Sequence, residues 1–146
     1  VVVHPQSIIH SMVEYVDGAI IAELGTPDMK LPIQYALYYP ERRFLPGDRV
    51  DFATLSQLTF EKPDMDTFCG LRLAMEAGKE GGSLPTVFNA ANELAVSKFL
   101  NRKIKYLEIP EIIETCMSLH KNIACPTVDE ILRTEQEVYE LIESRW

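Results

Sequence analysis

Two histidines near the start of the chain, His4 and His10, are the residues best suited to do chemistry. Histidine exchanges protons near neutral pH and is a common metal ligand. His4 follows an apolar run and opens the sequence His-Pro-Gln-Ser, so it lies at the end of an expected strand. A catalytic role and a hydrogen bond to the backbone are both open there, and the spacing alone favours the backbone role. Ser7 has no evident base partner, and two histidines without a carboxylate cluster do not make a metal site.

Other polar residues are weaker candidates. Residues 25–29, Gly-Thr-Pro-Asp-Met, form a turn-rich segment after an expected strand, where loops often border sites, although a plain connector is favoured by the spacing. Asn89, Asn92 and Glu93 lie at neighbouring positions of an alanine-rich helical segment and predict buried hydrogen bonds between helices. His120 lies at an expected helix end, where a cation is favoured. The sequence holds no Gly-rich phosphate-binding motif, so these residues alone do not complete a catalytic constellation.

The elements that position His4 are expected to be β-strands. Residues 11–24 predict a β-hairpin, in which Asp-Gly at 17–18 forms a two-residue type I′ turn with positive φ at both positions. A short helix is expected over 32–39, ending before Pro40. Five prolines lie between Gly25 and Asp66, which disfavours long regular elements in this part of the chain.

From residue 63 onward the pattern predicts four amphipathic helices with short links, which favours a small four-helix bundle. Asp66 is expected to cap the first helix, and Thr127 with Glu130 predicts a capping box at the start of the last. The cysteines are expected at buried helical positions. The residues expected to face inward are Phe68, Leu71 and Met75, then Val87, Ala91, Leu94 and Ala95, then Ile112, Ile113, Cys116 and Leu119, and finally Val128, Ile131, Leu132, Tyr139 and Ile142, with Glu135 on the same stripe.

Composition limits the classes of function. The chain has 146 residues, a formal net charge of −8 and 47% hydrophobic residues, as expected for a globular α+β protein. No nucleic-acid partner is expected, because the chain is acidic and holds no basic cluster larger than Arg42-Arg43. No membrane association is expected, because no apolar run approaches the roughly 20 residues of a membrane span. Three cysteines without a Cys-x-x-Cys pair fit a reducing intracellular compartment.

Several long segments resemble, in order, the motifs of the 1-deoxy-D-xylulose-5-phosphate reductoisomerase family. The resemblance is carried by Val-His-Pro-Gln-Ser-Ile-Ile-His-Ser-Met-Val at 3–13, Leu-Gly-Thr-Pro-Asp-Met-Lys-Leu-Pro-Ile at 24–33, Leu-Thr-Phe at 58–60, Leu-Ala-Met-Glu-Ala at 73–77 and Phe-Asn-Ala-Ala-Asn-Glu at 88–93. It covers nearly the whole chain. The cysteines and Trp146 have no counterpart among these motifs.

The resemblance implies an NADPH-dependent enzyme that isomerises and reduces 1-deoxy-D-xylulose 5-phosphate to 2-C-methyl-D-erythritol 4-phosphate, an early step of non-mevalonate isoprenoid synthesis. It implies a divalent Mg or Mn ion that acts as a Lewis acid, and a homodimer. His4 matches the family's His-Pro-Gln-Ser histidine, which lies close to the active site, and we therefore expect His4 to orient a catalytic group by hydrogen bonding. Pro27 and Met29 match a loop that forms a wall of the substrate pocket.

The resemblance also implies which part of the enzyme this chain is. Residues 1–34 match the C-terminal strands of an α/β catalytic domain, 35–62 a proline-rich linker, and 63–146 the C-terminal four-helix bundle. The start at Val1 without a methionine fits a fragment or a processed product. The family's metal ligands, phosphate-binding residues and cofactor domain precede these residues. We therefore expect the fragment alone to bind neither NADPH nor metal and to be inactive.

Two hypotheses remain open on the sequence alone. The first is the C-terminal part of a reductoisomerase, located in the bacterial cytoplasm or, alternatively, in a plastid-type organelle. The second is a self-contained helical interaction module that dimerises through its apolar hairpin. The gene discriminates between them, because a reading frame that extends upstream into a dinucleotide-binding fingerprint eliminates the module.

Overall fold

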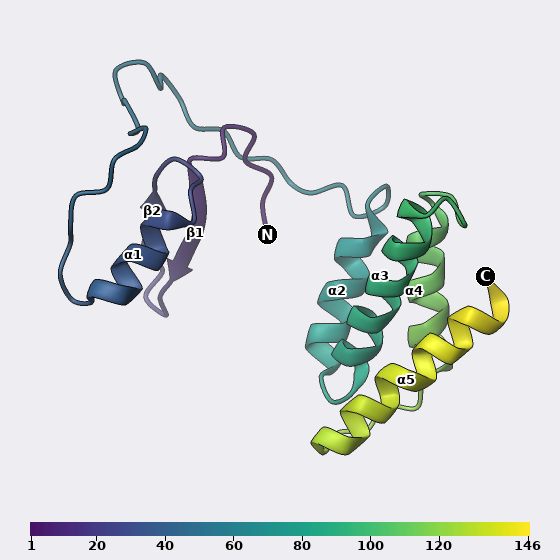
Figure 1. The fold of residues 1–146 in the computed structure, drawn as a ribbon. Helices are drawn as coiled ribbons and strands as arrows, with labels where there is room; N and C mark the ends of the chain where they lie inside the picture. The colour runs from purple at the N-terminus through teal and green to yellow at the C-terminus, as the bar shows by residue number, and fades with distance from the viewer. The chain divides into compact units, whose positions relative to one another are not determined.

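The computed structural model describes residues 1–146 and contains a two-stranded antiparallel sheet and five helices (Figure 1). The fold is therefore α+β, as the sequence predicts. The chain divides into two compact units, residues 1–63 and residues 64–146, and each is described by itself. No helix combines the length and the apolar character needed to cross a membrane.

The first unit contains the predicted hairpin, formed by strands β1 (Ile9–Glu14) and β2 (Ile20–Leu24). The strands pair antiparallel from Glu14 opposite Ile20 to Ile9 opposite Leu24, with an irregularity near Ile9. Most of the apolar side chains of this hairpin are exposed within the 146 residues. The sheet ends at two strands, and an isolated pair of strands is marginal in stability.

The hairpin turn differs from the predicted two-residue type I′ turn. Tyr15 and Ala19 flank a three-residue loop, in which the Gly18 N–H donates to the Tyr15 carbonyl oxygen at 2.9 Å. The Tyr15 N–H donates to the Ala19 carbonyl oxygen at 2.8 Å. Gly18 has φ +86°, whereas Asp17 does not have a positive φ. A three-residue loop needs only its last position in the left-handed region, which glycine adopts without strain.

After the hairpin, helix α1 (Lys30–Tyr38) begins two residues earlier than predicted. An Asp28 side-chain oxygen accepts a hydrogen bond from the Lys30 N–H at 2.9 Å and so supports the turn that leads into the helix. The residues from 39 to 63 contain turns and extended segments but no further helix. Near the end of this stretch, Glu61 pairs with Val3 in an isolated antiparallel bridge, so the segment lies beside the start of the chain.

The second unit consists of α2 (Cys69–Glu80), α3 (Leu84–Leu100), α4 (Glu108–Leu119) and α5 (Val128–Arg145), which lie against one another (Figure 1). Helix α3 contacts each of the other three. Its buried residues include three alanines, Ala90, Ala91 and Ala95, whose small side chains let neighbouring helices approach closely. The core they build with α2, α4 and α5 contains Leu73, Val87, Ile112, Ile113, Cys116, Val138 and Ile142.

The predicted inward faces are confirmed for α3 and wrong in part for the other helices. Phe68, which precedes α2, is 62% exposed and Met75 of α2 is 53% exposed, and Leu73 and Ala77 are buried instead. In α5, Val128 and Leu132 are largely exposed, and the buried stripe is Thr134, Val138 and Ile142. Leu119 of α4 is also exposed. Two overlapping stripes keep helical spacing in α5, and packing against α3 and α4 selects one of them.

The helix caps follow the prediction at α5 but not at α2. The Thr127 side chain accepts from the Glu130 N–H, and the Glu130 carboxylate accepts from the Thr127 N–H at 2.8 Å, so the capping box is confirmed. Asp66 does not cap α2. Instead Asp64 accepts hydrogen bonds from the N–H groups of Asp66 and Thr67, which lowers the pKa of Asp64. The Asp64 carboxylate, two residues before Asp66, thus accepts from the backbone N–H groups that precede α2.

A buried cation lies between α3 and α5. Lys98 is 4% exposed, and its Nζ donates to Glu143 Oε2 at 2.9 Å and to the Trp146 carbonyl oxygen at 3.3 Å. The hydrogen bond from Lys98 lowers the pKa of Glu143. Because an unpaired buried charge is costly, this pair supports the position of the last turn of α5.

The turn between α2 and α3 depends on two glycines in the left-handed region, Gly81 at φ +69° and Gly82 at φ +64°. A Cβ on Gly82 would lie 2.5 Å from the Ile123 carbonyl oxygen and 2.6 Å from Asn122 Oδ1. A Cβ on Gly81 would meet no atom within 4 Å. Gly82 is therefore required by space as well as by backbone conformation.

We predict that Gly82→Ala lowers the free energy of unfolding clearly more than Gly78→Ala does. Gly82→Ala combines the left-handed backbone cost of about 1–2 kcal/mol with the collision, whereas Gly78 lies within α2, has no positive φ and has no atom within 4 Å of its Cβ position. Urea unfolding followed by circular dichroism measures both. Equal losses in the two variants would contradict this explanation.

Candidate functional site

His4 lies in the first unit, beside the returning segment 59–61. The bridge exchanges hydrogen bonds of 2.9 Å between Val3 and Glu61 in both directions. His4 Nδ1 lies 2.8 Å from the Thr59 carbonyl oxygen. The His4 ring stacks on Phe60 with centroids 4.8 Å apart and planes 22° apart. The backbone hydrogen bond that the spacing favoured is thus confirmed, but its partner lies 55 positions away in the chain.

The other ring nitrogen, His4 Nε2, is buried and has no hydrogen-bond partner within the 146 residues. A carbonyl oxygen can only accept, so Nδ1 carries the proton in the hydrogen bond to Thr59. In the neutral ring Nε2 is then an acceptor. Buried polar atoms of native proteins almost always have a partner, so this nitrogen is a candidate acceptor for a further hydrogen bond.

The loop that holds Pro27 and Met29 is exposed and does not approach His4 through any hydrogen bond. Met29 is 71% exposed, and Pro27 is also exposed. Between them, Asp28 lines a cavity of about 420 Å³ in the first unit, whereas neither of its neighbours does. His10, the other candidate from the sequence, is exposed on β1.

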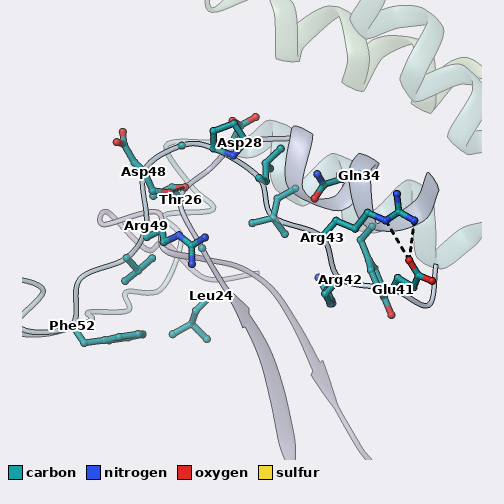
Figure 2. Close-up of a pocket in the computed structure, with 17 residues that line it drawn as sticks. Leu24, Thr26, Asp28, Gln34, Glu41, Arg42, Arg43, Asp48, Arg49 and Phe52 are labelled. Carbon is teal, nitrogen blue, oxygen red and sulfur yellow. Dashed lines mark hydrogen bonds and ion pairs between the residues drawn. The ribbon is translucent and has the colours of Figure 1, made fainter. Parts of the chain in front are cut away.

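The cavity is walled by the end of β2, by α1 and by residues 41–52 (Figure 2). Arg43 and Glu41 pair at one end with Nη2 and Oε2 2.9 Å apart. The Arg42 guanidinium lies 3.6 Å from the centroid of the Tyr35 ring. At the other end, Thr26 Oγ1 donates to the Asp48 carbonyl oxygen at 3.1 Å. These contacts hold the irregular segment in place, and both signs of charge line the space.

A polar cluster in the second unit was not predicted from the sequence. Ser83 is fully buried, and its Oγ lies 2.7 Å from His120 Nε2 and accepts from the Ile123 N–H at 2.9 Å. Asn122 Oδ1 accepts from the Ser83 N–H at 2.9 Å. The cluster ties the turn before α3 to the segment that follows α4. It offers no nucleophile, because Ser83 is inaccessible.

His120 differs from the expected helix-end cation. Burial lowers the pKa of His120, opposed by the smaller effect of Glu137, so the neutral ring is favoured. The predicted buried hydrogen bonds of the alanine-rich segment are also wrong, because Asn89 and Glu93 are exposed and Asn92 is only half-buried. The expectation of buried cysteines holds for Cys116 but not for Cys125, which is exposed.

No three His, Cys, Asp or Glu side chains of the 146 residues are grouped so that they could share a metal ion. The residues described here therefore do not by themselves fit a divalent cation.

Comparison with known proteins places this chain. The family described as the DXP reductoisomerase C-terminal domain matches residues 24–141. The chain belongs to this family. It is 66% identical over 146 residues to the 1-deoxy-D-xylulose 5-phosphate reductoisomerase of Agathobacter rectalis and 63% identical to that of Lachnospira eligens. It is fully covered in both comparisons and spans 38% of each relative.

Solved structures of the same family give the same result. The reductoisomerase of Zymomonas mobilis in complex with NADPH matches 98% of this chain and 38% of its own, with a TM-score of 0.88 and 44% identity. A DOX-P reductoisomerase in complex with NADPH, fosmidomycin and magnesium matches 98% of this chain and 37% of its own, with a TM-score of 0.89 and 38% identity. The family resemblance seen in the motifs is thus confirmed, and it favours the reductoisomerase over a self-contained module.

We predict that His120 titrates below the ordinary histidine pKa of 6.5, because burial disfavours its charged form. A histidine whose pKa is lowered by folding stabilises the fold above pH 6.5 and loses that contribution as the pH falls through the folded pKa. NMR titration of the His120 ring, with His120→Asn as the assignment control, measures this. A titration midpoint above pH 6.5 would contradict the prediction, because burial disfavours the charged ring.

Proposed function

We propose that the chain forms the C-terminal part of a 1-deoxy-D-xylulose 5-phosphate reductoisomerase, which isomerises its substrate and reduces the product with NADPH and a divalent Mg or Mn ion. The observation that carries the proposal is the 66% identity over all 146 residues to a relative of that name. At such identity the fold and the site residues are shared between relatives. NADPH supplies the hydride of the reduction when it is bound.

We further propose the division of labour within the chain. Residues 1–34 complete the catalytic domain, 35–62 connect, and 63–146 form the C-terminal helical domain. The separation of the structure into residues 1–63 and 64–146 supports a boundary close to residue 63. The buried core of α2 to α5 supports an independent helical domain.

Within this function His4 orients a catalytic group, and Pro27 and Met29 form part of the substrate-pocket wall. The buried, unpartnered Nε2 supports the role of His4. The exposure of Met29 supports its role, because an exposed methionine on a loop is free to contact a ligand. The metal and NADPH are held by the rest of the protein.

The whole protein is proposed to be a homodimer located in the bacterial cytoplasm. Exposed apolar side chains on both strands of the hairpin, including Val13, Tyr15 and Ile21, support pairing with a second copy. The relatives named above are bacterial proteins, which supports the location.

The test is NADPH oxidation by the purified whole protein with 1-deoxy-D-xylulose 5-phosphate and Mg²⁺, compared with the 146-residue chain. We expect turnover by the whole protein and none by the chain, because the chain has no metal-binding cluster of its own. Absence of turnover by the whole protein would overturn the proposed function. Turnover by the chain alone would overturn the proposed inactivity.

In the whole protein we predict that Met29→Ala lowers kcat/KM about tenfold, since one apolar contact with a ligand is lost. Met75→Ala is the matched control, because Met75 is also exposed, at 53%, but lies on α2 in the helical unit. Equal effects of the two substitutions would show that Met29 has no special place at the pocket.

A further inference from the structure

Thr59 and Gln6 form a clamp beside His4. The Thr59 N–H donates to Gln6 Oε1 at 3.2 Å, and Gln6 Nε2 donates to Thr59 Oγ1 at 2.8 Å. Thr59 Oγ1 also lies 3.2 Å from Gln6 Oε1. The amide of one side chain thus holds both the backbone and the hydroxyl of Thr59. These contacts fix the peptide whose carbonyl oxygen faces His4.

The orientation of this carbonyl group determines which ring nitrogen of His4 carries the proton. The carbonyl oxygen of Thr59 accepts from Nδ1 at 2.8 Å, so the neutral ring carries its proton on Nδ1. The stacked Phe60 ring, 22° from parallel, restricts rotation of the imidazole about its Cβ–Cγ bond. With the ring and the proton both fixed, Nε2 is held as a buried acceptor without a partner among these 146 residues.

We propose that Thr59 and Gln6 are positioning residues, which hold the Nδ1–H form of His4 so that Nε2 accepts a hydrogen bond from an N–H or O–H donor of the catalytic site. This proposal rests on the proposed function, which places His4 beside a catalytic site. Segments that fix the tautomer of a functional histidine through its second nitrogen have a large effect on activity without touching the ligand. The segment 59–61 is therefore a part of the site, although it lies in residues 35–62, which the family resemblance predicts to be a linker.

The test uses the whole protein labelled with ¹⁵N-histidine and three variants. Thr59→Val removes the hydroxyl and keeps the size of the side chain, Thr59→Ser keeps the hydroxyl, and Thr54→Val removes a hydroxyl from the same stretch that contacts only the Asp51 carbonyl oxygen. The ¹⁵N spectra report the tautomer of His4 directly. Steady-state kinetics report kcat and KM.

In the unsubstituted protein we expect a protonated Nδ1 and an unprotonated Nε2 that accepts a hydrogen bond. Thr59→Val should mix the two tautomers and lower kcat about tenfold, with KM changed less. Thr59→Ser and Thr54→Val should retain the Nδ1–H form and the activity. If the Nε2 signal shifts when substrate is added, the donor is a substrate hydroxyl. If it does not, the donor belongs to the protein.

Two results would overturn the proposal, namely a proton on Nε2 in the unsubstituted protein, or a Thr59→Val spectrum and kcat equal to those of Thr54→Val. A misfolded Thr59→Val variant is recognised by loss of circular dichroism, and Gln6→Leu then replaces it, because an apolar side chain can neither donate to Thr59 Oγ1 nor accept from the Thr59 N–H and hydroxyl. The tautomer is measured without turnover, so an inactive protein with the Nδ1–H form contradicts the proposed function alone. An active reductoisomerase with the other tautomer contradicts the clamp alone.

Discussion

The first unit depends on the pairing of its two ends. Val3 and Glu61 exchange two backbone hydrogen bonds, and the Gln6 side chain forms a second link by hydrogen bonding to Thr59. Without this pairing the unit would consist of a two-stranded hairpin, a helix with no buried residue and a long irregular segment, none of which is stable alone. The pairing also brings a carbonyl oxygen and an aromatic ring to His4. The chemistry available to His4 is therefore a consequence of chain closure rather than of the hairpin that follows it.

The second unit is stabilised in a different way. Its four helices bury an apolar core around α3, and its polar groups are satisfied locally. Lys98 is paired with Glu143, while Ser83 binds His120 and the backbone beyond it. The helical unit thus has a buried apolar core, whereas the contacts of His4 all lie within residues 1–63.

Local rules predicted part of this structure. The capping box at Thr127 and the buried face of α3 were predictable, because each depends on residues within a few positions of one another. The size of the hairpin loop was not, since Asp17-Gly18 fits either a two-residue or a three-residue turn. The buried face of α5 depends on its packing against α3 and α4, and the hydrophobic periodicity of one helix carries no information about its neighbours.

The candidate site shows the same division more sharply. His4 was identified from its motif, and a backbone partner was favoured, but nothing in the spacing pointed to Thr59. Their separation of 55 positions places the partner beyond any local rule. The motif Leu-Thr-Phe at 58–60 carried the family resemblance, and it was the one signal that could have drawn attention to this segment.

Amide hydrogen exchange of the whole protein tests the closure of the first unit most directly. The N–H groups of Val3, Thr59 and Glu61 each donate to a partner across the closure. We expect these three amides to exchange slowly and to open together, at one common free energy. Exchange of Thr59 and Glu61 at the rate of an unstructured peptide, while the amides of α3 remain protected, would contradict it.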